Sequence, residues 1–245
     1  MPLLGNYTGT QFGANVLTAP ADNEAIGADL LEREVRDGMK LVISDGSSTA
    51  FVARSLFNSP RQNITICTPS IAIANEFALA STHNPMLAGW HLQLLEGAFN
   101  RELFAVFGRR AEDFMAEEAA SSDLAIISVK AFVGIEGPVG KEPSSLALKR
   151  KTAEKANKIV WIADWKKLAH PTATGPKVYH SLSLWQTEAA NERTHVVVSS
   201  PPGFDPIADA GSVLPAVAKS DIDLFRVNLR KLKDLLQSRL RVVKP

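Results

Sequence analysis

The sequence predicts an α/β fold in which a mostly parallel sheet carries helices on both faces. Short apolar segments with strand character alternate with segments of helical periodicity along most of the 245 residues. The strand candidates are mostly apolar, which is typical of strands that are buried on both faces. With 45% hydrophobic and 22% charged residues, the chain has the composition of a folded domain with a sizeable core.

Six strands are expected from apolar, β-prone runs. A helix that Asp22 and Asn23 are expected to cap precedes the first strand, and Gly38 stands where a helix-ending glycine belongs. The predicted strands are residues 41–44, 64–67, 91–95, 124–129, 159–163 and 195–198, and further helices are predicted at residues 50–58, 71–80, 108–119, 144–157 and 222–242.

The turn after the first strand is the most informative segment. An acid, a glycine and three hydroxyl side chains stand directly before an expected helix N-terminus. Free backbone N–H groups and the helix dipole at such a point suit an anion such as a phosphate. The alternative interpretation is an ordinary Asp-Gly turn followed by a Ser/Thr helix cap. The turn consists of Asp45, Gly46, Ser47, Ser48 and Thr49.

Polar side chains also follow the other predicted strands. Because ligands bind outside the carboxyl ends of the strands in open parallel sheets, these side chains indicate a site for a polar small molecule. Each of them alone is compatible with ordinary turn chemistry, Thr68 and Ser70 most of all. The candidates in chain order are Thr68 with Ser70, Glu96, Lys130, and Asp164 with Lys167.

Charge and cysteine content exclude several functions. A net charge of +1 offers no general electrostatic case for nucleic acid or membrane surfaces, and no apolar run is long enough for a membrane helix. The five histidines lack metal-ligand spacing, so we predict no metal site, and we predict no cofactor. The single cysteine, Cys67, is expected to be a buried, inert thiol. Together with the absence of a signal peptide, it favours a cytoplasmic protein.

Six short motifs, in order, resemble the sugar-phosphate sensor domain of DeoR-type transcriptional regulators. Residues 45–49 are similar to its Asp-Gly-Thr-Thr-Thr loop, and residues 68–70 stand where it has Thr-Asn-Ser. Glu96-Gly97 falls on its Gly-Gly turn, and Gly108 with Ala111 fits the helix that follows. Residues 148–150 resemble its Val-Lys-Arg helix start, and residues 163–168 resemble its Ala-Asp-Ser-Ser-Lys-Phe turn.

The resemblance implies a Rossmann-like fold shared with ribose-5-phosphate isomerase and CoA-transfer enzymes. It also implies a crevice that binds a phosphorylated sugar, and we expect a homo-oligomer. The implied roles are phosphate binding by Ser47, Ser48 and Thr49, positive charge or sugar contacts from Lys149 and Lys167, and acceptance of sugar hydroxyls or fixing of the lysines by Asp45 and Asp164.

Three positions depart from the family pattern. Ser145 replaces a glutamate four residues before the helix lysine, and Ser128 replaces a glycine at the end of the fourth strand. Pro69 replaces the asparagine of the Thr-Asn-Ser turn, which removes a side-chain hydrogen-bonding group and a backbone donor. These changes, together with Glu96 in the crevice, could shift the ligand or abolish binding.

Three parts are expected along the chain. Residues 1–21 read as an irregular N-terminal arm on the surface, residues 22–200 as the sensor-like domain, and residues 201–245 as a C-terminal extension with an amphipathic helix. A winged helix-turn-helix needs roughly sixty residues before the sensor. We therefore expect no DNA-binding domain and no direct nucleic-acid contact in this chain.

The favoured hypothesis is a non-enzymatic sensor, and two alternatives stay open. An isomerase or deaminase acting on a phosphorylated sugar would need a general base and acid over its substrate, with Glu96 or Asp164 as the candidate base. A degenerate sensor fold that acts only as a protein-interaction module is the second alternative. The altered positions Pro69, Ser128 and Ser145 favour that module.

Overall fold

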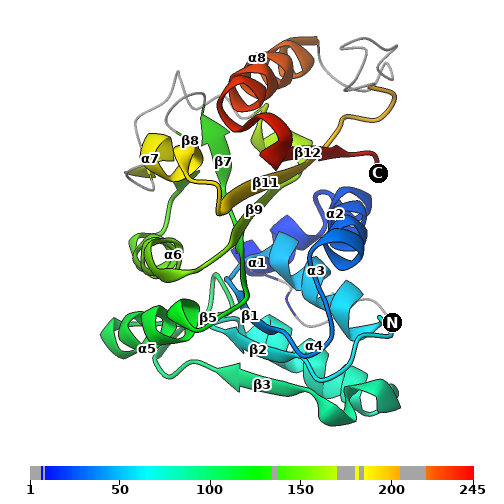
Figure 1. The fold of residues 1–245 in the computed structure, drawn as a ribbon, viewed down its shortest axis with the longest axis vertical. Coiled ribbons are helices and arrows are strands. Elements are labelled where there is room, and N and C mark those ends of the chain that lie inside the picture. The colour runs from blue at the N-terminus through cyan, green and yellow to red at the C-terminus, as the bar shows by residue number, and fades with distance from the viewer. Residues whose placement is uncertain (1–6, 8, 134–136, 170–179, 182–184, 205–218) are drawn as a thin grey trace.

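A central sheet of seven parallel strands organises the molecule (Figure 1). The computed structural model describes the chain except for residues 1–6, 8, 134–136, 170–179, 182–184 and 205–218. The strand order is β12-β11-β9-β6-β1-β2-β3, and every pairing between these neighbours is parallel. The strands are β1 (Lys40–Ile43), β2 (Thr65–Thr68), β3 (His91–Leu94), β6 (Leu124–Ser128), β9 (Ile159–Ala163), β11 (Thr194–Ser199) and β12 (Leu240–Val243).

Helices cover both faces of the sheet, which confirms the predicted fold class (Figure 1). Side chains alternate between the faces along each strand. In β1, Leu41 and Ile43 belong to one hydrophobic core, whereas Val42 belongs to the other. The first core lies under α1 (Gln11–Val16), α2 (Pro20–Arg33), α3 (Ser47–Phe57) and α4 (Ile71–Ser81), and the second lies under α5 (Arg109–Ala120), α6 (Pro143–Lys155), α7 (Trp185–Ala190) and α8 (Lys219–Leu236).

Apolar runs flanked by turn residues were reliable guides to the elements. The predicted strand 159–163 coincides with β9, and the predicted helix 71–80 matches α4 except for one residue. Cys67 in β2 is free and buried, and burial raises the pKa of its thiol to about 12, as expected for an inert cysteine. Among the described residues, no helix is long and apolar enough to cross a membrane.

The structure corrects three predictions near the ends of the chain. Residues 11–16 are not irregular, because they form α1 and bury Phe12 and Val16. The helix α2 begins at Pro20 with Ala19 as its N-cap and no side-chain cap, whereas Asp22 and Asn23 lie buried in its first turn. The last helix is shorter than predicted, since α8 ends at Leu236 and residues 240–243 form β12.

Short accessory strands surround the carboxyl ends of the central strands. A hairpin of β4 (Ala98–Asn100) and β5 (Ala105–Phe107) follows β3. A three-stranded antiparallel sheet contains β7, β8 and β10. These strands were not predicted, because two to four residues are too few to show a period. Their bounds are β7 (Ala131–Val133), β8 (Gly137–Gly140) and β10 (His180–Ser181), and the 3-10 turns are η1 (Pro85–Gly89), η3 (Trp165–Lys167) and η4 (Gln237–Arg239).

Candidate functional site

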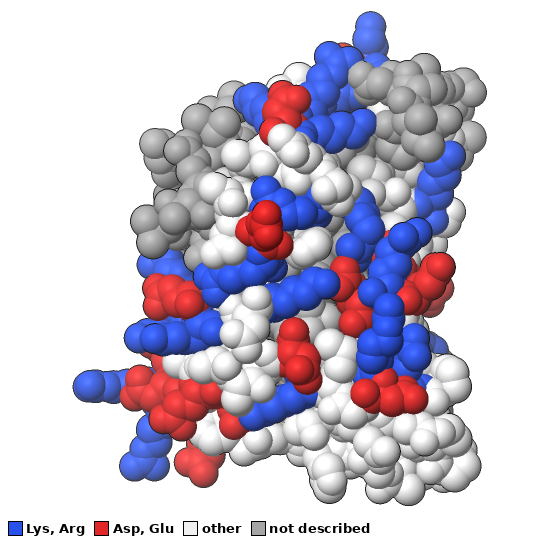
Figure 2. All heavy atoms as spheres, viewed as in Figure 1, with Lys and Arg blue, Asp and Glu red and all other residues white. Residues whose placement is uncertain are grey.

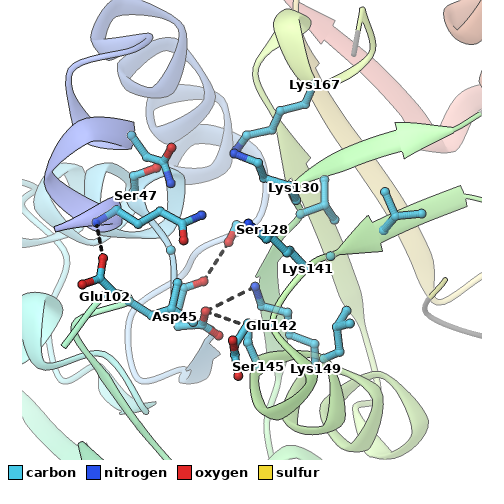
Figure 3. A pocket seen from close by; sticks show the side chains of 18 of the residues that line it. Asp45, Ser47, Glu102, Ser128, Lys130, Lys141, Glu142, Ser145, Lys149 and Lys167 are labelled. Atoms are coloured by element: carbon cyan, nitrogen blue, oxygen red, sulfur yellow. Dashed lines mark hydrogen bonds and ion pairs between the residues drawn. The ribbon is translucent and has the colours of Figure 1, made fainter. Parts of the chain in front are cut away.

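A polar cavity of about 550 Å³ opens at the carboxyl ends of β1, β6 and β9 (Figure 3). This volume is in the usual range for small-molecule sites. The structure brings seven of the twelve predicted binding residues together in its lining. These are Asp45, Gly46, Ser47, Lys130, Lys149, Asp164 and Lys167.

Gly46 shapes the turn between β1 and the cavity. Its φ of +131° and ψ of 160° lie in a region that is essentially restricted to glycine. A Cβ atom at this position would come within 2.3 Å of Ser128 Oγ. Gly46 therefore allows α3 to begin directly beside β6, with Ser47 in the cavity lining at its first turn.

Asp45 lies at the centre of a buried network on the cavity floor. The Ser145 hydroxyl donates to Asp45 Oδ2 at 2.8 Å, and Lys149 Nζ lies 3.5 Å from the same oxygen. The Ser128 hydroxyl donates to the Asp45 carbonyl oxygen at 2.7 Å. Two of the three departures from the family pattern thus contact one residue. The pKa of Lys149 is lowered by burial and by Lys167, against the opposing charge of Asp45.

A group of lysines forms one wall of the cavity, and Figure 3 shows Lys130, Lys141, Lys149 and Lys167 on the same side. Lys167 Nζ lies 3.3 Å from Asp164 Oδ2 and donates to Ser48 Oγ at 2.7 Å. Burial lowers the pKa of Lys130, and the ammonium group of Lys167 lowers it further. An anion bound near crowded, partly desolvated ammonium groups stabilises their charged form.

The other five predicted residues do not line the cavity. The Thr49 hydroxyl donates to the Gly46 carbonyl at 2.9 Å, and Ser48 reaches the site only through Lys167. Thr68 Oγ1 accepts from the Ser70 N–H, and Ser70 Oγ caps α4 by accepting from the Ile73 N–H. Glu96 is exposed beyond β3, at the edge of the sheet, while the cavity lies at its middle.

Several lining residues were missed because they come from segments without strand or loop motifs. Gln11 and Asn15 belong to α1, and Asn100 and Glu102 belong to the β4–β5 hairpin. Amide side chains spaced by four residues share a helix face, which was the one available signal for the first pair. Lys141, Glu142 and Lys166 complete the charged part of the lining.

The structure defines an α/β domain with a lysine-rich cavity at the carboxyl edge of its parallel sheet, the edge where ligands bind in open α/β sheets. Residues 22–175, more than half of the chain, match the model of the DeoR C terminal sensor domain. The chain belongs to this family. None of the curated proteins matches it significantly in sequence.

Solved structures resemble parts of the chain at low sequence identity. Ribose 5-phosphate isomerase A from Neisseria gonorrhoeae is 15% identical, with a TM-score of 0.42 over 61% of this chain and 54% of that one. Ribose 5-phosphate isomerase from Plasmodium falciparum is 13% identical, with a TM-score of 0.39 over 59% of this chain and 51% of that one. A probable sor operon regulator from Shigella flexneri is 12% identical, with a TM-score of 0.39 over 58% of this chain and 72% of that one. The matched part of this chain thus corresponds to about half of each isomerase.

Proposed function

We propose that the protein binds a phosphorylated sugar, or a related small phosphate ester, as the effector of a DeoR-type sensor. The observation that carries this proposal is the convergence of Lys130, Lys149 and Lys167 on a cavity beside the N-terminus of α3. Ammonium groups and the positive end of a helix dipole both favour a phosphate. Membership of the sensor family supports the same ligand class.

The acids in the cavity suit the sugar part of such a ligand. Asp164 lines the cavity beside Lys167, and the Asp45 carboxylate lies on the cavity floor, bonded to Ser145 and Lys149. Carboxylate oxygens accept hydrogen bonds from hydroxyl groups. A ligand with one anionic group and several hydroxyls would therefore use both kinds of charge in the cavity.

A thermal-shift screen with ribose, fructose and glucosamine phosphates tests the proposal. A binder at 100 times its dissociation constant should stabilise the fold by about 2.7 kcal/mol, whereas the parent sugars should produce no shift. Replacing Lys130 by methionine should weaken binding by about tenfold or more, because it removes a charge-assisted contact. Lys155→Met, on an exposed part of α6, is the matched control. Absence of any shift at millimolar phosphorylated sugar would contradict the proposal.

An isomerase or deaminase on the same scaffold is the rival that this screen can expose. Asp164 lines the cavity but is ion-paired with Lys167, and Glu96 does not line it. The Asp164 carboxylate is therefore already in contact with an ammonium group. If the purified chain converted a phosphorylated sugar and Asp164→Asn abolished this turnover, the protein would be an enzyme and the sensor hypothesis would be wrong.

Self-association through β3 is the second part of the proposal. β3 is an edge strand of the central sheet, and residues 77–95 contain no Lys, Arg, Asp or Glu. Figure 2 shows a largely uncharged surface at the lower right, where Figure 1 places η1 and the start of β3. Exposed Leu79, Met86 and Leu94 lie in this segment. Edge strands without charges readily pair with another copy.

Sedimentation of the purified chain tests this interface. We expect the wild-type chain to be at least dimeric at micromolar concentration and Leu94→Lys to be monomeric, because a charge on an edge strand opposes pairing. Leu17→Lys, at an exposed position that follows α1 and lies outside residues 77–95, serves as the control. A monomeric wild-type chain would refute the proposed interface and leave the ligand proposal untouched.

A further inference from the structure

The helix α1 lines the cavity although it precedes residues 22–175, the part that matches the sensor family. Its sequence is amphipathic within only two turns. Phe12 and Val16 face the core and are 2% and 0% exposed, whereas Gln11 and Asn15 line the cavity. Residues four apart share a helix face, so one face anchors the helix and the adjacent face is presented to the ligand.

Contacts at both ends hold α1 against the cavity. The Gln11 N–H donates to Glu102 Oε2 at 3.1 Å, and the Phe12 N–H donates to the Glu102 carbonyl at 2.9 Å. Beyond the other end, Lys166 Nζ donates to the Thr18 carbonyl at 3.1 Å. Both Glu102 and Lys166 line the cavity themselves. The helix is therefore a built part of the site.

The two sides of the cavity differ in charge. Figure 3 shows Glu102 on the side opposite Lys130, Lys141 and Lys149. The lining contributed by α1 and the β4–β5 hairpin is Gln11, Asn15, Asn100, Glu102 and Leu103, which includes no lysine or arginine. Amide groups donate and accept hydrogen bonds, as hydroxyl groups do, and a carboxylate repels a phosphate.

We propose that α1 is the sugar-recognising wall of the cavity, with Gln11 and Asn15 hydrogen-bonded to hydroxyl groups of a ligand whose single phosphate lies among the lysines. The proposal rests on the proposed function and narrows it to monophosphates of polyhydroxylated molecules. A second phosphate would have to lie against Glu102 and the neutral amides, where the one lysine of the described lining that contacts the α1 segment, Lys166, is bonded to the Thr18 carbonyl.

Titration calorimetry of the full chain separates the two ends of the ligand. The probes are ribose 5-phosphate, fructose 1-phosphate, glucosamine 6-phosphate, fructose 1,6-bisphosphate and inorganic phosphate. Gln11→Leu and Asn15→Leu should each weaken the best-bound monophosphate by about tenfold or more, since a site built for hydroxyl groups loses its partners. Both variants should bind inorganic phosphate as the wild-type chain does, whereas Lys130→Met should weaken both probes.

Leu17→Gln, at the C-cap of α1 where the side chain is 70% exposed, is the matched control and should leave the affinities unchanged. Wild-type affinity for the monophosphate in Gln11→Leu and Asn15→Leu would overturn the assignment of α1 while leaving the proposed function intact. Binding of the bisphosphate as tight as that of the monophosphate would also overturn it. Failure of the wild-type chain to bind any sugar phosphate would overturn the proposed function and this inference together.

Discussion

Replacement of Lys149 by methionine is expected to lower the free energy of unfolding by about 3–5 kcal/mol at neutral pH, because it leaves Asp45 charged and buried without its cation. The side chains of Lys149 and Asp45 are 11% and 4% exposed, and 3.5 Å separates Nζ from Oδ2. Methionine keeps most of the side-chain volume, so the decrease in stability reflects the lost charge rather than a new cavity. Denaturant unfolding followed by circular dichroism measures it.

The double variant Asp45→Asn/Lys149→Met should be more stable than Lys149→Met alone, because no buried charge is left unpaired. The control Lys155→Met, on an exposed part of the same helix, should change stability by less than about 0.5 kcal/mol. If Lys149→Met and its double variant were equally unstable, Asp45 would not be the cause of the loss.

Replacement of Arg241 by leucine is expected to cost about 1.5–3 kcal/mol, since it removes charge-assisted hydrogen bonds that join β12 to α2 while Lys158 still pairs with Glu34. Arg241 Nε donates to Asp29 Oδ2 at 2.9 Å, and Nη1 donates to Glu34 Oε1 at 2.6 Å. The Glu34 side chain is only 4% exposed. Burial alone would raise the Glu34 pKa, but hydrogen bonds from Lys158 and Arg241 outweigh it, and the pKa is lowered from 4.5.

The pH dependence of unfolding provides an independent readout for Arg241. Because the folded-state pKa of Glu34 is lowered, its contribution is complete above pH 4.5 and is lost as the pH falls through the folded-state value. The deficit of Arg241→Leu relative to wild type should therefore shrink in acid. Arg33→Leu, which removes an exposed partner of the same Asp29, should cost less than about 1 kcal/mol. A deficit that is unchanged in acid would show that lost packing, rather than charge, destabilises the variant.

The parallel sheet could be predicted from sequence because burial on both faces leaves a clear pattern. Residues 159–163 and 196–198 are continuous apolar runs, and both belong to inner strands of the sheet. The strand β12 gave a weaker pattern, since Leu240 and Val242 continue the leucine spacing of the preceding helix. Only its pairing with β11 shows that these residues are extended. Tertiary pairing therefore overrode the local helical period.

The site was predictable where a residue follows a strand directly. Asp164 directly follows β9, and one residue separates Asp45 from β1, so topology alone places both at the cavity. Thr68 ends β2 and Ser70 follows it, but β2 lies farther towards the sheet edge and its turn is used to begin α4. Gln11 and Asn15 reach the cavity through packing that joins distant parts of the chain, and their four-residue spacing indicates a shared helix face but not what that face contacts.

The bonds between Arg241 and α2 also bear on how the chain folds. They join residues 212 and 207 positions apart in sequence, so they form only after the ends of the chain have come together. The entropy of closing a long loop is lost before contacts between distant residues can stabilise the chain, and this slows the folding of parallel sheets. Until β12 docks, β11 is an open edge with the run Val196-Val197-Val198, a segment prone to intermolecular pairing. Refolding yield should therefore fall with increasing protein concentration.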